Sequence, residues 1–354
     1  MTKLTARLFV LIALLPALGS GRNESQQKLY VLNSELDTMT VVDVASNEVL
    51  GKIEVGPQPH GLASPKSQDV LWVSAEGADE LVKVDPVTDR VLARYPVGRR
   101  PNEIEVTSDG RLVFIPALVD GVYQVFDTKA EKVVKTVATD GFPHNVVVSF
   151  DDRYAYLCPM DREPYYTEAQ AKDRGIPFST NQKLYVLDIA SLSVVGHVEL
   201  PDAPRPITIH PKCHRVYLNR DGLLGFEIVD TVARKRIATA EFEMTREERA
   251  TPSRSHGIGV THDGREVWST DINNGVVHAF DVTSDQPKHI ARLETGRSPL
   301  WLTITPDGKT VYVSNTADNT VSAFDVAAKK EVARIRLPEG TAPKRILVLR
   351  IPLT

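Results

Sequence analysis

Three histidines recur in similar surroundings along this sequence. His60 lies in GPQPHGLA, His144 in GFPHNVVV and His256 in SRSHGIGV. In each stretch turn-forming residues precede the histidine and apolar residues follow it, which is typical of a loop that leads into a strand. Neutral imidazole binds Zn, Cu, Fe or Ni, and three protein ligands with an open fourth position are typical of a catalytic metal site. Whether the three side chains can meet depends on the elements that carry them.

A repeat organises the chain around these histidines. The final unit is the clearest, with alternating apolar segments at 300–304, 310–315, 320–326 and 331–337 separated by turn residues. Four short strands in about 42 residues are typical of a β-propeller blade. The third segment of each unit ends in an apolar residue followed by aspartate, and we interpret these aspartates as turn caps. They are Asp43, Asp85, Asp127, Asp188, Asp230, Asp281 and Asp325.

The two ends of the repeat region predict how the ring closes. KLYVLN at 28–33 matches the second strand of a unit, whereas KRILVLRI at 344–351 matches a first strand. Pairing these two segments would complete one blade and remove two exposed sheet edges. The sequence therefore predicts an all-β, seven-bladed β-propeller with four-stranded blades, which forms a single domain over 28–354 and is closed by its C-terminal strand.

The segment PDGKTVYVSNTADNTVSAFDV at 306–326 resembles the YVTN-type β-propeller repeat family, and the segments at 108–127 and 262–281 keep its outline. The resemblance covers essentially everything after the N-terminal segment, and it implies a seven-bladed propeller. The family includes surface-layer and periplasmic proteins. Related propellers include lactonases, lyases and the tetrapyrrole-binding domain of a cytochrome-type nitrite reductase, so the resemblance implies no single chemistry.

The loops that lead into the first strand of each blade should converge at one mouth of the central channel. The residue that ends each loop is, in blade order from the second, His60, Asn102, His144, Arg205, His256, Leu300 and Lys344. The histidines thus fall in alternate blades, and we predict that His60, His144 and His256 bind a transition metal such as Cu, Zn or Fe. Two alternatives stay open, a metal-free ligand site and a solvated channel lining.

Other residues around the same mouth are predicted to bind ligand. Asn102 shares the ring with the histidines, and Arg205 and Lys344 add positive charge that would hold an anion. An insertion at 160–182 carries Tyr165 and Tyr166, which we predict as further ligand-binding residues, and the same loop is a candidate surface for a protein partner. A second insertion at 243–255 leads into His256, and its TREERA stretch is expected to be helical.

Carboxylates at the mouth are candidates for a fourth metal ligand or a general base. The sequence favours Asp161 and Glu163 for this role because their loop also follows Cys158.

Charge and targeting signals narrow the class of protein. The net charge of −4 gives no reason to expect nucleic-acid binding. Residues 1–21 combine a basic start, a short apolar run and small residues, which is typical of a signal peptide. We therefore expect an exported protein, periplasmic or secreted, with no membrane span after removal of the signal.

The sequence contains no G-x-S-x-G, H-E-x-x-H or C-x-x-C-H motif, which disfavours a serine-triad hydrolase, a zincin and attached haem. Three hypotheses are consistent with the remaining features. The first is an exported protein that binds a small ligand or a transition metal at the mouth of the channel. The second is a metal-dependent lyase, lactonase or oxidoreductase that uses the three histidines. The third is a protein-interaction scaffold.

Overall fold

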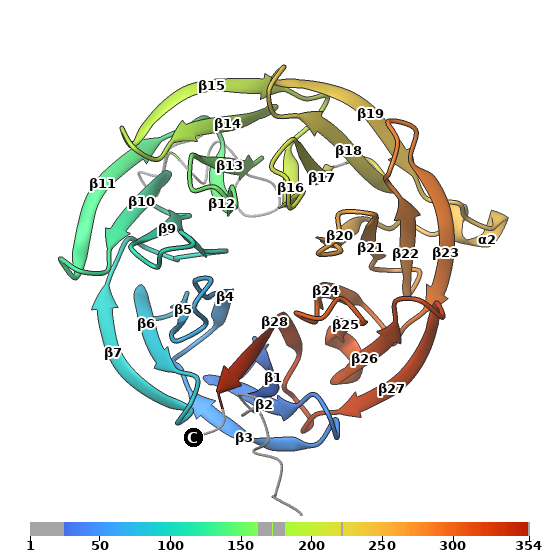
Figure 1. Cartoon of the computed structure of the whole chain (residues 1–354), viewed down its shortest axis with the longest axis horizontal. Coiled ribbons are helices and arrows are strands. Elements are labelled where there is room, and N and C mark those ends of the chain that lie inside the picture. Colours follow the sequence, from blue (N-terminus) through green and yellow to red (C-terminus); the bar gives the residue numbers. More distant parts are fainter. Residues whose placement is uncertain (1–24, 162–171, 173–180, 221, 353–354) are drawn as a thin grey trace, which may run out of the picture.

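The computed structural model is a ring of seven four-stranded antiparallel sheets around a central channel (Figure 1). It describes residues 25–161, 172, 181–220 and 222–352. This architecture confirms the predicted seven-bladed propeller. The strands are β1 Ser25–Asn33, β2 Thr38–Asp43, β3 Val49–Glu54, β4 Pro59–Ala63, β5 Leu71–Ala75, β6 Glu80–Asp85, β7 Arg90–Pro96, β8 Glu105–Val106, β9 Leu112–Ala117, β10 Val122–Asp127, β11 Lys132–Ala138, β12 Phe142–Val148, β13 Tyr154–Met160, β14 Lys183–Asp188, β15 Ser193–Glu199, β16 Pro204–Ile209, β17 Arg215–Arg220, β18 Gly225–Asp230, β19 Lys235–Glu241, β20 Ser255–Val260, β21 Glu266–Asp271, β22 Val276–Asp281, β23 Lys288–Glu294, β24 Pro299–Ile304, β25 Thr310–Asn315, β26 Thr320–Asp325, β27 Lys330–Arg336 and β28 Pro343–Pro352.

The first blade is assembled from both ends of the described chain. Its sheet has the order β28-β1-β2-β3, and β28 pairs antiparallel with β1 from Ser25 opposite Pro352 to Asn33 opposite Pro343. The predicted closure is therefore confirmed. The other blades follow in chain order, beginning with β4, β8, β12, β16, β20 and β24.

Apolar side chains of the inner strands fill the space between neighbouring blades. Between the first two blades, for example, Tyr30, Leu32, Val41, Val73 and Val82 form part of one buried cluster. The outermost strands are the most exposed: in β3 only Ile53 is buried, and in β7 exposed residues alternate with half-buried ones.

The aspartate that ends each third strand caps the turn that follows it. Asp43 accepts the backbone amide of Ser46 at 2.8 Å, and Asp325 accepts that of Ala328 at 2.7 Å. The turn-cap interpretation is confirmed in all seven blades.

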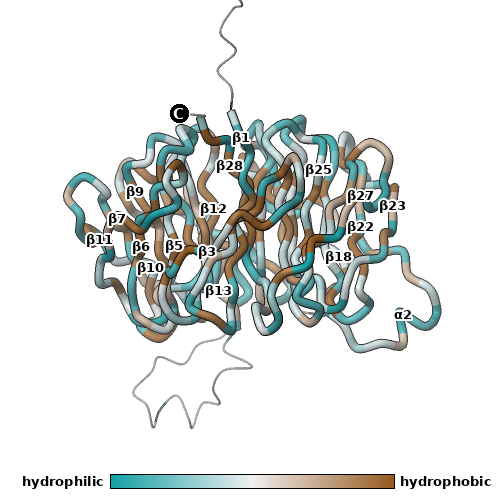
Figure 2. Tube along the Cα trace, turned by 90° about the horizontal axis from the view of Figure 1, so that it is seen from below, coloured by the Kyte–Doolittle hydropathy of each residue, from teal (hydrophilic) through white to brown (hydrophobic). Residues whose placement is uncertain are grey.

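Short helices lie in loops between strands of the ring. The predicted helix of the second insertion is α2, Arg246–Ala250, and Thr245 and Glu248 form a capping box at its start. A 3₁₀ helix, η1 Thr316–Asp318, links β25 to β26. Figure 2 shows α2 projecting at one face of the ring, whereas the start of β1, which pairs with the end of β28, lies at the other. Across the described residues, no helix has the length and hydropathy needed to cross a membrane.

Candidate functional site

A β-bulge near the start of the first strand positions the residues at the channel mouth. In β4, Pro59 pairs with Ala75 and Leu62 pairs with Val73, so two residues, His60 and Gly61, lie opposite one. A bulge of this kind bends the strand and redirects a side chain. Matching register shifts occur in β12, β16, β20, β24 and β28, and they include His144, Arg205, His256, Leu300 and Lys344.

In the second and seventh blades, a hydroxyl group on the second strand joins the bulge to the next blade. Ser74 accepts the amide of Gly61 at 2.7 Å and donates to the carbonyl of Asn102 at 2.7 Å. A Cβ at Gly61 would lie 2.6 Å from that same carbonyl oxygen and 2.7 Å from the amide nitrogen of Ile104. Glycine is therefore required here because the backbones of two blades approach too closely for a side chain.

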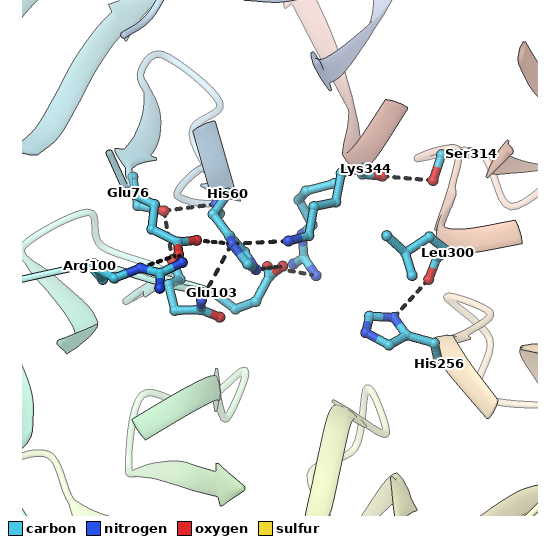
Figure 3. Close-up of polar contacts among 12 residues, drawn as sticks. His60, Glu76, Arg100, Glu103, His256, Leu300, Ser314 and Lys344 are labelled. Atoms are coloured by element: carbon cyan, nitrogen blue, oxygen red, sulfur yellow. Dashed lines mark hydrogen bonds and ion pairs between the residues drawn. The ribbon is translucent and has the colours of Figure 1, made fainter. Parts of the chain in front are cut away.

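His60 lies at the centre of a buried polar cluster (Figure 3). Its Nδ1 contacts a carboxylate oxygen of Glu76 and lies 3.0 Å from Nζ of Lys344. Its Nε2 is 3.4 Å from Oε1 of Glu103, and Nδ2 of Asn102 is 3.3 Å from Nδ1. Four side chains, which come from the first, second and third blades, thus meet around one imidazole.

Glu76 orients this imidazole. Burial raises the pKa of Glu76, but His60, Lys344 and Arg100 more than offset burial and lower the pKa to about 2. Arg100 donates to Glu76 from Nε at 2.8 Å and also through Nη2. Glu76 is therefore ionised at neutral pH and favours the proton on Nδ1 of His60, which leaves Nε2 as the nitrogen that can accept a proton.

Glu103 is fully buried behind His60. Arg345 forms an ion pair with it at 3.5 Å, and Arg345 also stacks on Trp301 with its guanidinium carbon 4.2 Å from the ring centre. Among the described residues, neither carboxylate oxygen of Glu103 has a hydrogen-bond partner. These oxygens can therefore accept hydrogen bonds from a ligand at the mouth.

The other two histidines are neutral. Burial lowers the pKa of His144 and His256 well below the usual value, and nearby cations lower both further; Arg205 and Lys344 act on each of them. Nδ1 of His256 lies 2.8 Å from the carbonyl oxygen of Leu300 and donates to it, so Nε2 carries the lone pair. Among the described residues, Nδ1 of His144 has no hydrogen-bond partner.

The structure brings some of the predicted residues together and separates others. His60, Asn102 and Lys344 belong to one cluster, and the rings of His60 and His144 are 6.4 Å apart between centres. His256 packs edge-on against Trp301 at 5.2 Å. Within the part of the chain that is described, no group of three or more His, Cys, Asp or Glu side chains is arranged to hold a metal ion. The Cu, Zn or Fe site stays a prediction.

Arg205 also lies at the mouth, where its Nη1 is 3.2 Å from the sulfur of Met160. Asp161 accepts the backbone amide of Asn181 at 2.6 Å, so it closes the base of the first insertion. Tyr165, Tyr166 and Glu163 lie outside the described residues, and a protein partner for 160–182 stays a prediction.

Sequence reasoning identified Asn102 and Lys344 beside His60 but missed the other residues around it. It did not single out Glu76, Arg100, Glu103 or Arg345 as site residues. The available signal was position, because Glu103 and Arg345 directly follow the ring residues Asn102 and Lys344. A bulge makes two successive residues face the channel region, and this effect could have extended the predicted ring.

Comparison with known proteins supports the fold and gives a limited indication of chemistry. Residues 229–332 match the family described as lactonase, 7-bladed beta-propeller. The match begins at the end of the fifth blade and runs through most of the seventh, so it leaves out His60, Glu76 and Glu103. No curated protein matches the chain.

Solved structures with the same fold have different activities. The periplasmic gluconolactonase of Pseudomonas aeruginosa has a TM-score of 0.72 at 16% identity, covering 93% of this chain and 100% of that chain. Kuenenia stuttgartiensis hydrazine synthase has 0.71 at 19% identity, covering 85% and 92%. A dihydro-heme d1 dehydrogenase has 0.65 at 14% identity, covering 92% and 67%. At these identities the similarity establishes the fold alone.

Proposed function

We propose that the protein binds a small hydroxylated carboxylate, of the sugar-acid class, at the mouth of its channel. The observation that carries the proposal is the presence of the neutral imidazoles of His144 and His256 among cations. This combination offers positive charge to a carboxylate and lone pairs to hydroxyl groups in the same space.

The charge balance of the mouth favours an anion. Arg100, Arg205, Arg254 and Lys344 influence the titration of the histidines and Glu76 there, whereas Glu76 and Glu103 are the carboxylates in contact with His60. With Arg345, which pairs with Glu103, five cations face two carboxylates and leave a positive site. A positive, partly desolvated site attracts an anion more strongly than the same charges would in open water.

Hydrogen-bond acceptors at the mouth explain why hydroxyl groups are included in the ligand class. Nε2 of His256 presents a lone pair because Nδ1 donates to Leu300. The oxygens of Glu103 accept no hydrogen bond from the described residues. A bare carboxylate would leave these acceptors without partners at a cost in free energy, whereas a polyhydroxy acid supplies donors to them.

Titration calorimetry with D-gluconate tests this proposal, with D-glucose as the matched uncharged ligand. We expect gluconate to bind and glucose to bind at least about tenfold more weakly. Lys344→Met removes the ammonium beside His60 while keeping most of the side-chain volume, and it should weaken gluconate binding by about tenfold or more. Lys309→Met, at an exposed position, is the control. Equal binding of gluconate and glucose, or unchanged binding by Lys344→Met, would contradict the proposal.

A second candidate function is hydrolytic opening of a sugar lactone, favoured by the His60–Glu76 pair and by the lactonase match. Nε2 of His60 would take a proton from water while the water oxygen bonds to the lactone carbonyl carbon. The ammonium of Lys344 would stabilise the oxyanion. The ring C–O bond then breaks, and the proton on His60 passes to the leaving alkoxide, so that lactone and water give one hydroxy acid.

Proton release during incubation with D-glucono-δ-lactone, followed in a pH-stat above the spontaneous rate, tests the second function. His60→Ala should abolish the enzymatic rate. If the wild-type protein binds gluconate but does not accelerate proton release, the binding function holds and the hydrolytic one is excluded for this lactone. Export, predicted from residues 1–21, is tested separately by fractionation of the producing cells.

A further inference from the structure

The half of the channel away from the mouth contains a separate cavity. Its volume is about 610 Å³, within the range of roughly 300–1,000 Å³ that is usual for small-molecule sites. Residues of the turns between first and second strands, such as Pro65, Pro211 and Pro306, surround its opening. The cavity therefore opens on the face where β1 begins in Figure 2.

The wall of this cavity is mostly apolar and contains a ring of equivalent positions. Each position lies on a first strand, directly opposite an aromatic residue of the second strand in the same blade. The seven residues, in blade order from the second, are Ala63, Glu105, Val147, Thr208, Gly259, Thr303 and Leu347. Glu105 is the charged member of an otherwise uncharged ring.

Few groups near Glu105 stabilise the negative charge of its carboxylate. Its Oε1 accepts the amide of Val106 at 3.0 Å, and the described residues contain no cation within ion-pair distance of it. Burial raises the pKa of Glu105 to about 7, Arg345 opposes this shift, and Glu103 adds to it. A carboxyl group held in this way gains most from a partner that brings a positive charge into the cavity.

Arg345 cannot be that partner without leaving its present contacts. It pairs with Glu103 at 3.5 Å and lies on the face of Trp301. With Glu105 ionised, the two carboxylates and one guanidinium at this level of the channel sum to a charge of −1. One monovalent cation would neutralise the group.

We propose that this cavity is a second binding site, which takes a small molecule with an apolar body and a primary ammonium group that pairs with Glu105. The aliphatic wall, with Ile207, Ile258, Ile304 and Val148, would cover the apolar body. The proposal does not rest on what binds at the mouth, because Glu105 and the aliphatic wall belong to the other half of the channel, although Glu103 and Arg345 lie between the two sites.

Calorimetry at pH 8 with three probes of one length tests the proposal: n-octylamine, n-octanol and n-octanoate. We expect octylamine to bind at least about tenfold more tightly than octanol, and octanoate to bind most weakly. Glu105→Gln keeps the shape of the side chain and should reduce octylamine affinity to that of octanol, without changing octanol binding. Thr303→Val, at an equivalent ring position, should change neither. Octylamine that binds no more tightly than octanol to the wild-type protein would overturn the proposal.

The wild-type protein offers a second measurement that does not depend on a variant folding. Octylamine affinity should rise by about threefold to tenfold between pH 6 and pH 8 as Glu105 ionises, and octanol affinity should stay constant. The charged groups that face Glu105 are Glu103 and Arg345, and the rim of the cavity adds Lys66, Asp152 and His262. His262→Gln removes the imidazole at the rim, and this variant should keep the pH dependence. Loss of the pH dependence in that variant would overturn the assignment to Glu105.

Discussion

The two halves of the channel are built from the same strands but differ in how charge is compensated. At the mouth, carboxylates meet cations in pairs, Glu76 with Arg100 and Glu103 with Arg345. In the other half, Glu105 stands in an apolar wall without an ion-pair partner among the described residues. The repeat thus determines where side chains point, whereas the residues at each level determine whether charges there are paired.

The largest change in stability is expected when a carboxylate that is paired with cations is removed from the mouth. Glu76→Gln would leave His60, Lys344 and Arg100 close together without their carboxylate. We expect the free energy of unfolding to fall by about 3–5 kcal/mol, because loss of one partner leaves buried charge uncompensated. Denaturant unfolding at pH 7 measures this change. Glu80→Gln, which breaks a more exposed pair with Arg94, should cost less than about 1 kcal/mol.

Glu76 should also make the stability of the protein depend on pH in the acidic range. Because the pKa of Glu76 in the fold is lowered to about 2 from an ordinary value of 4.5, its stabilising effect is complete above pH 4.5. The effect is lost as the pH falls from 4.5 towards 2. The stability difference between wild type and Glu76→Gln should therefore shrink over that range, and a difference that stays constant from pH 6 to pH 3 would argue against the pairing.

The uncompensated carboxyl should behave in the opposite sense. Because the pKa of Glu105 is raised from 4.5 to about 7, ionisation increasingly disfavours the folded state as the pH rises from 4.5 past 7. Glu105→Gln should therefore unfold at a higher temperature than wild type at pH 8, with a gain of up to about 3 kcal/mol. At pH 4 the two should be alike. Greater stability of the wild type at pH 8 would show that Glu105 is compensated after all.

A smaller loss of stability is expected from a change at Gly61, which lies beside His60 in the bulge of β4. Gly61→Ala would push a Cβ against the backbone of Asn102 and Ile104, and we expect a loss of about 1–3 kcal/mol. Gly51→Ala is the matched control, because no atom lies within 4 Å of a Cβ there, and it should be neutral or slightly stabilising. Thermal unfolding of both variants compares them directly. Equal stability of the two would show that the blades can separate at the mouth.

The repeat allowed the fold and the composition of the mouth to be predicted from sequence. Each unit carries its own strand and turn signals, so the blade count and the closure by 344–351 followed from local patterns. The contacts of His60 did not, because Glu76, Arg100 and Lys344 reach it from three different segments. The bulge was a further obstacle: its extra residue is visible only in the strand pairing, and in β28 it includes Arg345, which pairs with Glu103. The cavity in the other half of the channel could not be predicted from local patterns, because residues of all seven blades form its wall.

Closure of the ring by β28 has a consequence for when recognition begins. Lys344 and Arg345 both belong to this strand, which is synthesised last among the described strands and pairs with the first. A nascent or C-terminally clipped chain without β28 lacks the ammonium beside His60 and the guanidinium over Trp301. If the proposed binding function holds, a ligand that needs Lys344 would therefore bind closed molecules in preference to open ones.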